Sequence, residues 1–187
     1  MHIRVLGKTK KRDKDFYEIL SAVTISVTIG ILAGFLLTKF VDKLYLIPGL
    51  LIILPGFLET QGNIMGSLGA RIGTSLNVGR VKKETTTFIK GNIIASIFLA
   101  IIVGFVLGLA GFLTTYLVFG IVDYNLLFII PIACILAVII EIPLVIWTSF
   151  WLFRKGYDPD DIVGPYVVAI GDVISVVSLF IVVVGLL

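Results

Sequence analysis

Sulfur and imidazole ligands are almost absent from this sequence of 187 residues, which contains one cysteine, Cys134, and one histidine, His2. A single cysteine forms no disulfide within the chain and carries no information about redox compartment. One cysteine and one histidine are too few for a structural zinc site, which needs several such ligands. Because the only histidine lies at the N-terminus, the sequence also lacks a Ser-His-Asp set, and we expect no enzyme activity.

Charged residues are scarce as well: they make up 14% of the sequence, whereas 58% of the residues are hydrophobic and the mean hydropathy is +1.13. Soluble domains contain about 25% charged and about 45–50% apolar residues. Both departures favour a protein that lies in the lipid bilayer. We therefore predict an all-α, multi-pass protein of the cell membrane.

Five hydrophobic runs are long enough to cross a bilayer, which takes roughly 20 helical residues. They predict a five-helix transmembrane domain over residues 17–187, preceded by a basic tail at 1–16, with spans at about 17–38, 44–68, 89–119, 125–153 and 163–187. The first run exceeds the apolar core of a signal peptide, and no small-x-small cleavage site ends it. We interpret it as an uncleaved span.

Proline and glycine interrupt the second run, at Pro48, Pro55, Gly56, Gly62 and Gly66. Proline removes a backbone donor and clashes with the preceding turn of a helix. We therefore predict that the second helix is broken by Pro and Gly and lines a protein-enclosed or wet cavity, since lipid offers the freed carbonyls no partner.

Basic residues predict the orientation. They gather before the first span and in the second and fourth connections, whereas the opposite side carries only Lys39 and Lys43. The positive-inside rule then places the N-terminus in the cytoplasm and the C-terminus outside. Topology accounts for the whole distribution, so we expect no nucleic-acid partner and only incidental contact with anionic lipid headgroups.

Small residues recur as Gly30-x-x-x-Gly34 and Gly104-x-x-x-Gly108, a spacing that lets helix backbones approach closely. Ordinary helix packing is favoured here over a specific dimer seam.

Three carboxylates fall inside the predicted spans, at Glu59, Glu141 and Asp172, and no Lys, Arg or His lies at comparable depth. A charge near the bilayer centre is costly and is expected to face a cavity and a partner. Because no basic side chain is available to balance these charges, we expect a bound cation or a proton to do so. Asp172 is the strongest candidate because Ser175, three residues on, shares its helix face; a protonated aspartic acid bonded to a neighbouring helix is the alternative.

The other two carboxylates sit beside helix-disturbing prolines. Glu59 lies between Pro55 and Gly62, where carbonyls and the Asn63 amide could join it as the oxygen ligands that Mg²⁺ and Ca²⁺ prefer. Glu141 precedes Pro143, and its sequence context leaves a cation or proton role and a structural hydrogen bond equally open.

Two separated motifs resemble one known family. The stretch Pro55-Gly-Phe-Leu-Glu-Thr-Gln-Gly-Asn63, continuing to Arg71, resembles the second-helix signature of MgtE-type magnesium transporters, and still more that of solute carrier family 41. Asp158-Pro-Asp, then Pro165, then Gly171-Asp172, resembles the pattern that leads into the last helix of that family. The resemblance covers most of the chain from about residue 17.

The resemblance implies a homodimer or pseudo-dimer of five-helix units, with an ion path lined by the second and fifth helices. It implies that Asp172 is the central cation site, that Asn63 lines the path, and that Asp158 lies near its cytoplasmic mouth. Two positions depart from the family pattern: Glu59 stands where glycine is common, and Gly164 where bacterial members often carry asparagine.

The leading interpretation is therefore that a homodimer transports divalent cations, with Mg²⁺ as the first candidate. Other divalent cations also suit oxygen ligands. Glu59, Glu141 and Asp158 are further candidate ligands beside Asp172 and Asn63. The alternative is a non-transporting membrane subunit or scaffold whose intramembrane acids stay protonated.

Overall fold

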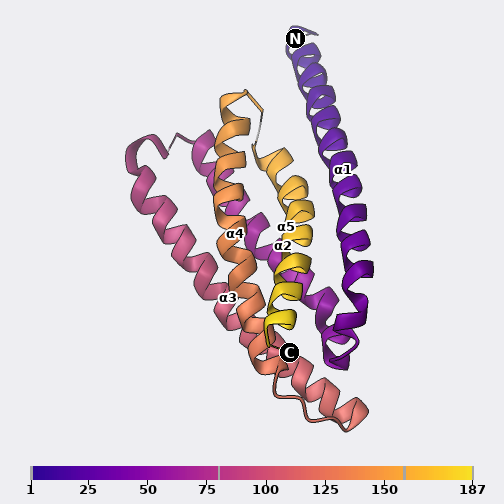
Figure 1. The fold of residues 1–187 in the computed structure, drawn as a ribbon. Coiled ribbons are helices and arrows are strands. Elements are labelled where there is room, and N and C mark those ends of the chain that lie inside the picture. Colours follow the sequence, from indigo (N-terminus) through magenta and orange to yellow (C-terminus); the bar gives the residue numbers. More distant parts are fainter. Residues whose placement is uncertain (1, 80, 158, 187) are drawn as a thin grey trace.

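Five α-helices make up the computed structural model, which describes residues 2–79, 81–157 and 159–186, with side chains other than those of 2–15, 18, 81–85 and 160–161. The helices are α1 (His2–Leu44), α2 (Pro48–Asn77), α3 (Val81–Phe119), α4 (Leu126–Arg154) and α5 (Pro159–Leu186) (Figure 1). The all-α prediction is confirmed. Each predicted span overlaps one helix, and α1 also includes most of the basic N-terminal stretch.

Four of the helices are long and apolar enough to cross a membrane, over Ile19–Leu44, Thr86–Phe119, Leu126–Arg154 and Ile162–Leu186. The chain is therefore a multi-pass membrane protein, as predicted. The helix α2 falls outside this group because its second half is rich in glycine and polar residues.

The predicted break in the second helix is wrong, because α2 runs as one helix through Pro55 and Gly62 to Asn77. Pro55 removes a single backbone donor, and the turns on either side continue the helix. The glycines serve packing instead: a Cβ added at Gly62 would lie 3.3 Å from Val168 Cγ1, and one at Gly69 would lie 2.6 Å from Val163 Cγ1. Their missing side chains let α5 approach α2.

The helix α2 lies at the centre of the bundle, in contact with α3, α4 and α5. Phe57, Met65 and Ile72 on its inner face are fully buried. The helix α1 is peripheral and packs mainly along α5 (Figure 1). Ser26 Oγ donates to the Pro165 carbonyl at 2.7 Å, and the rings of Phe40 and Phe180 stack at 3.8 Å.

Glycine also sets the contact between α3 and α4. A Cβ at Gly104 would lie 2.9 Å from Pro131 Cα, and one at Gly108 would lie 2.9 Å from the Leu126 carbonyl oxygen. The ordinary packing predicted for this pair is confirmed within one chain. Gly30 and Gly34 differ, since among the described residues no heavy atom lies within 4 Å of a Cβ built on either.

We expect Gly104→Ala to lower the free energy of unfolding by about 1–3 kcal/mol, because the new methyl meets backbone and one helix must shift. Gly30→Ala is the matched control: its methyl enters open space, and helix propensity favours alanine by about 0.5–1 kcal/mol. Unfolding of the purified protein in mixed micelles by a denaturing detergent measures both. Equal effects of the two substitutions would contradict the α3–α4 contact.

Candidate functional site

The helices α2 and α5 run antiparallel, and their glycine contacts define how the two are aligned. Gly62 on α2 meets Val168 on α5, and Gly69 meets Val163 one to two turns nearer the start of α5. Moving the other way by about one turn from the Gly62–Val168 contact brings Glu59 level with Asp172. Two of the three carboxylates predicted to lie in the membrane, Glu59 and Asp172, are therefore neighbours across this helix pair.

Glu59 and Asn63 form one polar pair on the surface of α2. Asn63 Nδ2 donates to Glu59 Oε1 at 3.2 Å, a contact between residues four apart on one helix face. Both side chains are exposed in the single chain. Arg71, two turns further along α2, donates from Nη1 to Asn92 Oδ1 of α3 at 3.3 Å.

Asp172, on α5, is close in the fold to both other carboxylates, and its side chain is half-buried. Glu59 of α2 lies level with Asp172, and the Glu141 carboxylate of α4 packs at Gly171, the residue before Asp172. All three predicted intramembrane carboxylates are thus gathered near one turn of α5. Within the described ranges, no three Asp, Glu, His or Cys side chains are grouped closely enough to hold a metal ion by themselves.

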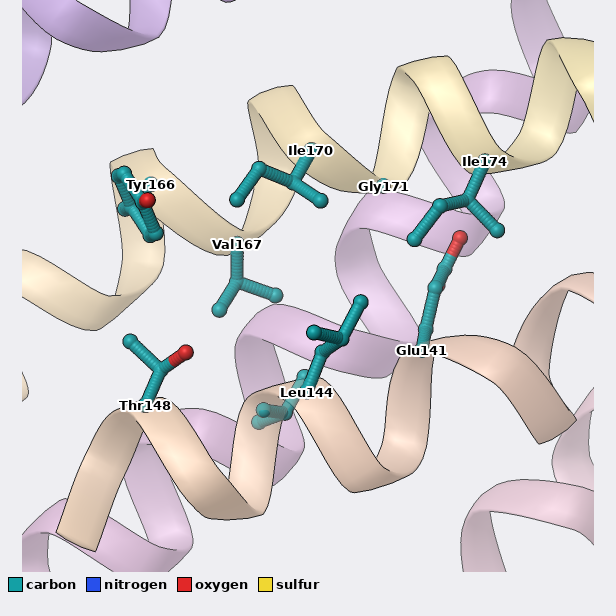
Figure 2. Close-up of a pocket in the computed structure, with 9 residues that line it drawn as sticks. Glu141, Leu144, Thr148, Tyr166, Val167, Ile170, Gly171 and Ile174 are labelled. Carbon is teal, nitrogen blue, oxygen red and sulfur yellow. The ribbon is translucent and has the colours of Figure 1, made fainter. Parts of the chain in front are cut away.

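Glu141 belongs to the interior of the chain, with only 2% of its surface exposed. Its side chain extends from α4 toward α5, between Gly171 and Ile174 (Figure 2). Ser175 Oγ donates to Glu141 Oε1 at 3.1 Å, and the carboxylate packs on the backbone at Gly171. Glu141 therefore contacts the α5 turn that carries Asp172.

A small cavity of about 10 Å³ extends from Glu141 between α4 and α5. Its walls are mainly aliphatic, with Thr148 and Tyr166 at the far end from Glu141 (Figure 2). A cavity of this size is just large enough to hold one water molecule. The cavity has room for a water next to the carboxylate and no room for a hydrated ion.

Three buried polar atoms have no hydrogen-bond partner among the described residues: Gln61 Oε1, Glu141 Oε2 and Ser178 Oγ. Gln61 Nε2 donates to the Cys134 carbonyl at 3.5 Å, so the amide is held between α2 and α4. Since buried polar atoms are normally paired, ordered water is the expected partner. Sequence reasoning missed Gln61, although an amide inside a hydrophobic run was the available signal.

The predicted site residues thus divide into groups. Asp172, Glu59 and Asn63 lie together at the open α2–α5 face, whereas Glu141 contacts the same α5 turn from the interior. Asp158 lies outside the described residues. Its neighbour Pro159 begins α5 and is buried. The open face thus presents two carboxylates and an amide oxygen, and such ligands attract hard cations.

Comparisons with known proteins agree with this chemistry. Residues 54–182 match the family model of MgtE, described as a divalent cation transporter. No curated protein and no solved structure gave a match. The matched region spans well over half of the chain and includes Glu59, Asn63, Glu141 and Asp172, in a family of transporters rather than enzymes. This multi-pass membrane protein therefore belongs to the MgtE family of divalent cation transporters.

Proposed function

We propose that the protein carries Mg²⁺ across the membrane as a homodimer, along a path lined by α2 and α5 of both copies. In this arrangement Asp172 is the central cation ligand, and Glu59 and Asn63 stand beside it. The observation that carries the proposal is the exposed Glu59–Asn63 pair, level with Asp172, on a face that one chain leaves open.

The case for a second copy rests on the position of Glu59. The residue lies roughly 17 Å along α2 from Pro48, near the middle of a ~30 Å hydrocarbon core if α2 crosses the membrane. A carboxylate exposed to lipid at that depth costs several kcal/mol. If two copies paired through their α2–α5 faces about a two-fold axis, Glu59 of one copy would face Glu59 of the other. The carboxylates of Glu59 and Asp172 from both copies would then lie around that axis.

This pairing also supplies what one chain lacks. A single chain brings no three acidic side chains into metal-binding range within the described residues, whereas two copies would double the ligands at one level of the membrane. Mg²⁺ usually keeps several waters and takes only one or two carboxylates, so Asp172 from each copy would suffice. The Asn63 amide would then hold the waters of the ion.

The membrane topology that we propose has five crossings, because α2 crosses the membrane in addition to the four apolar helices. The N-terminus lies in the cytoplasm. In its support, the two chain termini lie at opposite ends of the bundle (Figure 1). The second half of α2 contacts α4 and α5 at Gly69 and α3 through the Arg71–Asn92 hydrogen bond. Asp158, just before α5 in the sequence, would meet the cation at the cytoplasmic mouth.

Two measurements test the proposal together. Liposomes containing the purified protein and a trapped Mg²⁺-sensitive dye should show Mg²⁺ entry that protein-free liposomes lack. In a Cys134→Ala background, Asn63→Cys should be linked into covalent dimers by a short bifunctional thiol reagent. Phe105→Cys is the control: it is also exposed, but lies on α3, away from the proposed dimer face.

The outcomes separate the parts of the proposal. Mg²⁺ entry without linked dimers would refute the α2 interface and leave transport standing. Linked dimers of folded protein without flux of Mg²⁺ or any other divalent cation would favour the non-transporting subunit. Equal linking of Asn63→Cys and Phe105→Cys would show random collision and contradict the assigned interface.

A further inference from the structure

A cleft opens between α3 and α4 on the side of the bundle away from α1. The two helices touch closely where Gly104 and Gly108 meet α4, and they diverge toward the start of α3 and the end of α4 (Figure 1). The space between them holds a cleft of about 510 Å³. That volume lies within the roughly 300–1,000 Å³ typical of small-molecule sites.

The wall of the cleft is apolar along its length. Ile142, Ile146 and Phe150 line it from α4, and Ile93 lines it from α3. These side chains offer no hydrogen-bonding group to a ligand. The part of a ligand that fits against them is therefore a hydrocarbon chain.

The mouth of the cleft is basic. Arg154, in the last turn of α4, lines the cleft and is exposed. Lys90 lies three residues before Ile93 on α3, and so shares its helix face at the same end. The Arg154 guanidinium thus lines one end of a hydrocarbon-lined cleft, and the helix face of Ile93 carries Lys90 toward the same end, an arrangement suited to phosphate.

We infer that this cleft binds one anionic glycerophospholipid, with its headgroup phosphate at Arg154 and Lys90 and an acyl chain along Ile142, Ile146 and Phe150. Basic pockets between transmembrane helices recognise anionic headgroups in this way. Trp147 and Trp151 also line the cleft, and tryptophan is enriched at the level of lipid headgroups. The site is separate from the open α2–α5 face and does not depend on the transport proposal.

The two tryptophans of the chain provide the measurement. Trp147 and Trp151 are its only tryptophans, and their stacked rings lie 6.1 Å apart at the cleft. Lipids with brominated acyl chains quench tryptophan fluorescence on contact. Both rings also border a cavity between α1, α4 and α5, so variants of Arg154 and Lys90 are needed to assign the quenching to the α3–α4 cleft.

The full chain is reconstituted in phosphatidylcholine vesicles that contain increasing amounts of brominated phosphatidylglycerol, or of brominated phosphatidylcholine in a parallel series. We expect half-maximal quenching by the anionic lipid at a roughly tenfold lower mole fraction, since each basic residue near a membrane surface favours anionic lipid. The double variant Arg154→Gln/Lys90→Gln should lose this preference while keeping the quenching by phosphatidylcholine. A circular dichroism spectrum equal to that of the unaltered protein shows that the variant is folded.

The control is Lys39→Gln/Lys43→Gln, which removes the same charge at the end of α1 and should keep the preference. Equal quenching by the two brominated lipids in the unaltered protein would overturn the inference. A preference that survives in Arg154→Gln/Lys90→Gln would overturn it too. Tryptophans protected from both lipids would show that something other than lipid fills the cleft.

Discussion

Replacing Asp172 by asparagine is expected to lower Mg²⁺ flux at least about 150-fold, because each interaction with a charged group is worth about 1.5–3 kcal/mol and a homodimer would lose two of them. Asparagine keeps the size of the side chain and one oxygen, so the fold is preserved while the charge is lost. The comparison is made in proteoliposomes at equal protein content, with dimer formation checked for each variant.

Asp42→Asn is the matched control, since it removes an exposed carboxylate near the end of α1. Its flux should equal that of the unaltered protein. Full Mg²⁺ flux through a folded Asp172→Asn dimer would remove Asp172 from the ion path. Equal losses in Asp172→Asn and Asp42→Asn would indicate a general effect of surface charge and would also contradict the assigned role.

Truncating Glu141 to alanine is expected to lower the free energy of unfolding by about 3 kcal/mol, since it strips the buried Ser175 hydroxyl of its acceptor and leaves a cavity between α4 and α5. Glu141→Gln should stay close to the unaltered protein, because the amide oxygen can still accept from Ser175. Detergent-induced unfolding followed by circular dichroism measures all variants on one scale.

The control for Glu141 is Glu59→Ala, which removes the same atoms from an exposed position. It should cost far less stability than Glu141→Ala. If the two alanine variants are equally stable, the buried contact with Ser175 does not hold α4 and α5 together. If Glu141→Gln is as unstable as Glu141→Ala, the carboxylate itself is required, and the hydrogen bond alone does not explain its burial.

Hydrophobic patterning was enough to predict the helices and to single out the carboxylates within the apolar runs. Long apolar runs can only be helices in a bundle of this kind, because lipid leaves backbone groups no other partner. The same reasoning located Asp172 and Glu59, since an acidic residue within such a run stands out whatever surrounds it.

Which way each carboxylate faces could not be predicted from sequence. Glu59 and Glu141 look alike in the sequence, each beside a proline, yet Glu59 is exposed and Glu141 is buried against Ser175. The difference depends on how α2, α4 and α5 are rotated against one another. That rotation is set by contacts between residues far apart in the chain, such as Gly62 with Val168.

The continuity of α2 has a related explanation. Local propensity makes proline and glycine helix breakers, whereas in the bundle the glycines are the positions at which α5 packs closely on an intact α2. A helix-breaking tendency of about 1 kcal/mol per glycine is small beside the packing it permits. Tertiary contacts decided the outcome.

The attachment of α1 to α5 has a consequence for biogenesis. Ser26 and Pro165 are separated by 139 residues. A ribosome that adds about 5–20 residues per second needs about 7–28 s to make that interval. During this time α1 has entered the bilayer without the helix that will hold it, which suits its largely lipid-compatible surface. Docking of α1 is thus a late assembly step, completed only after the last helix is synthesised.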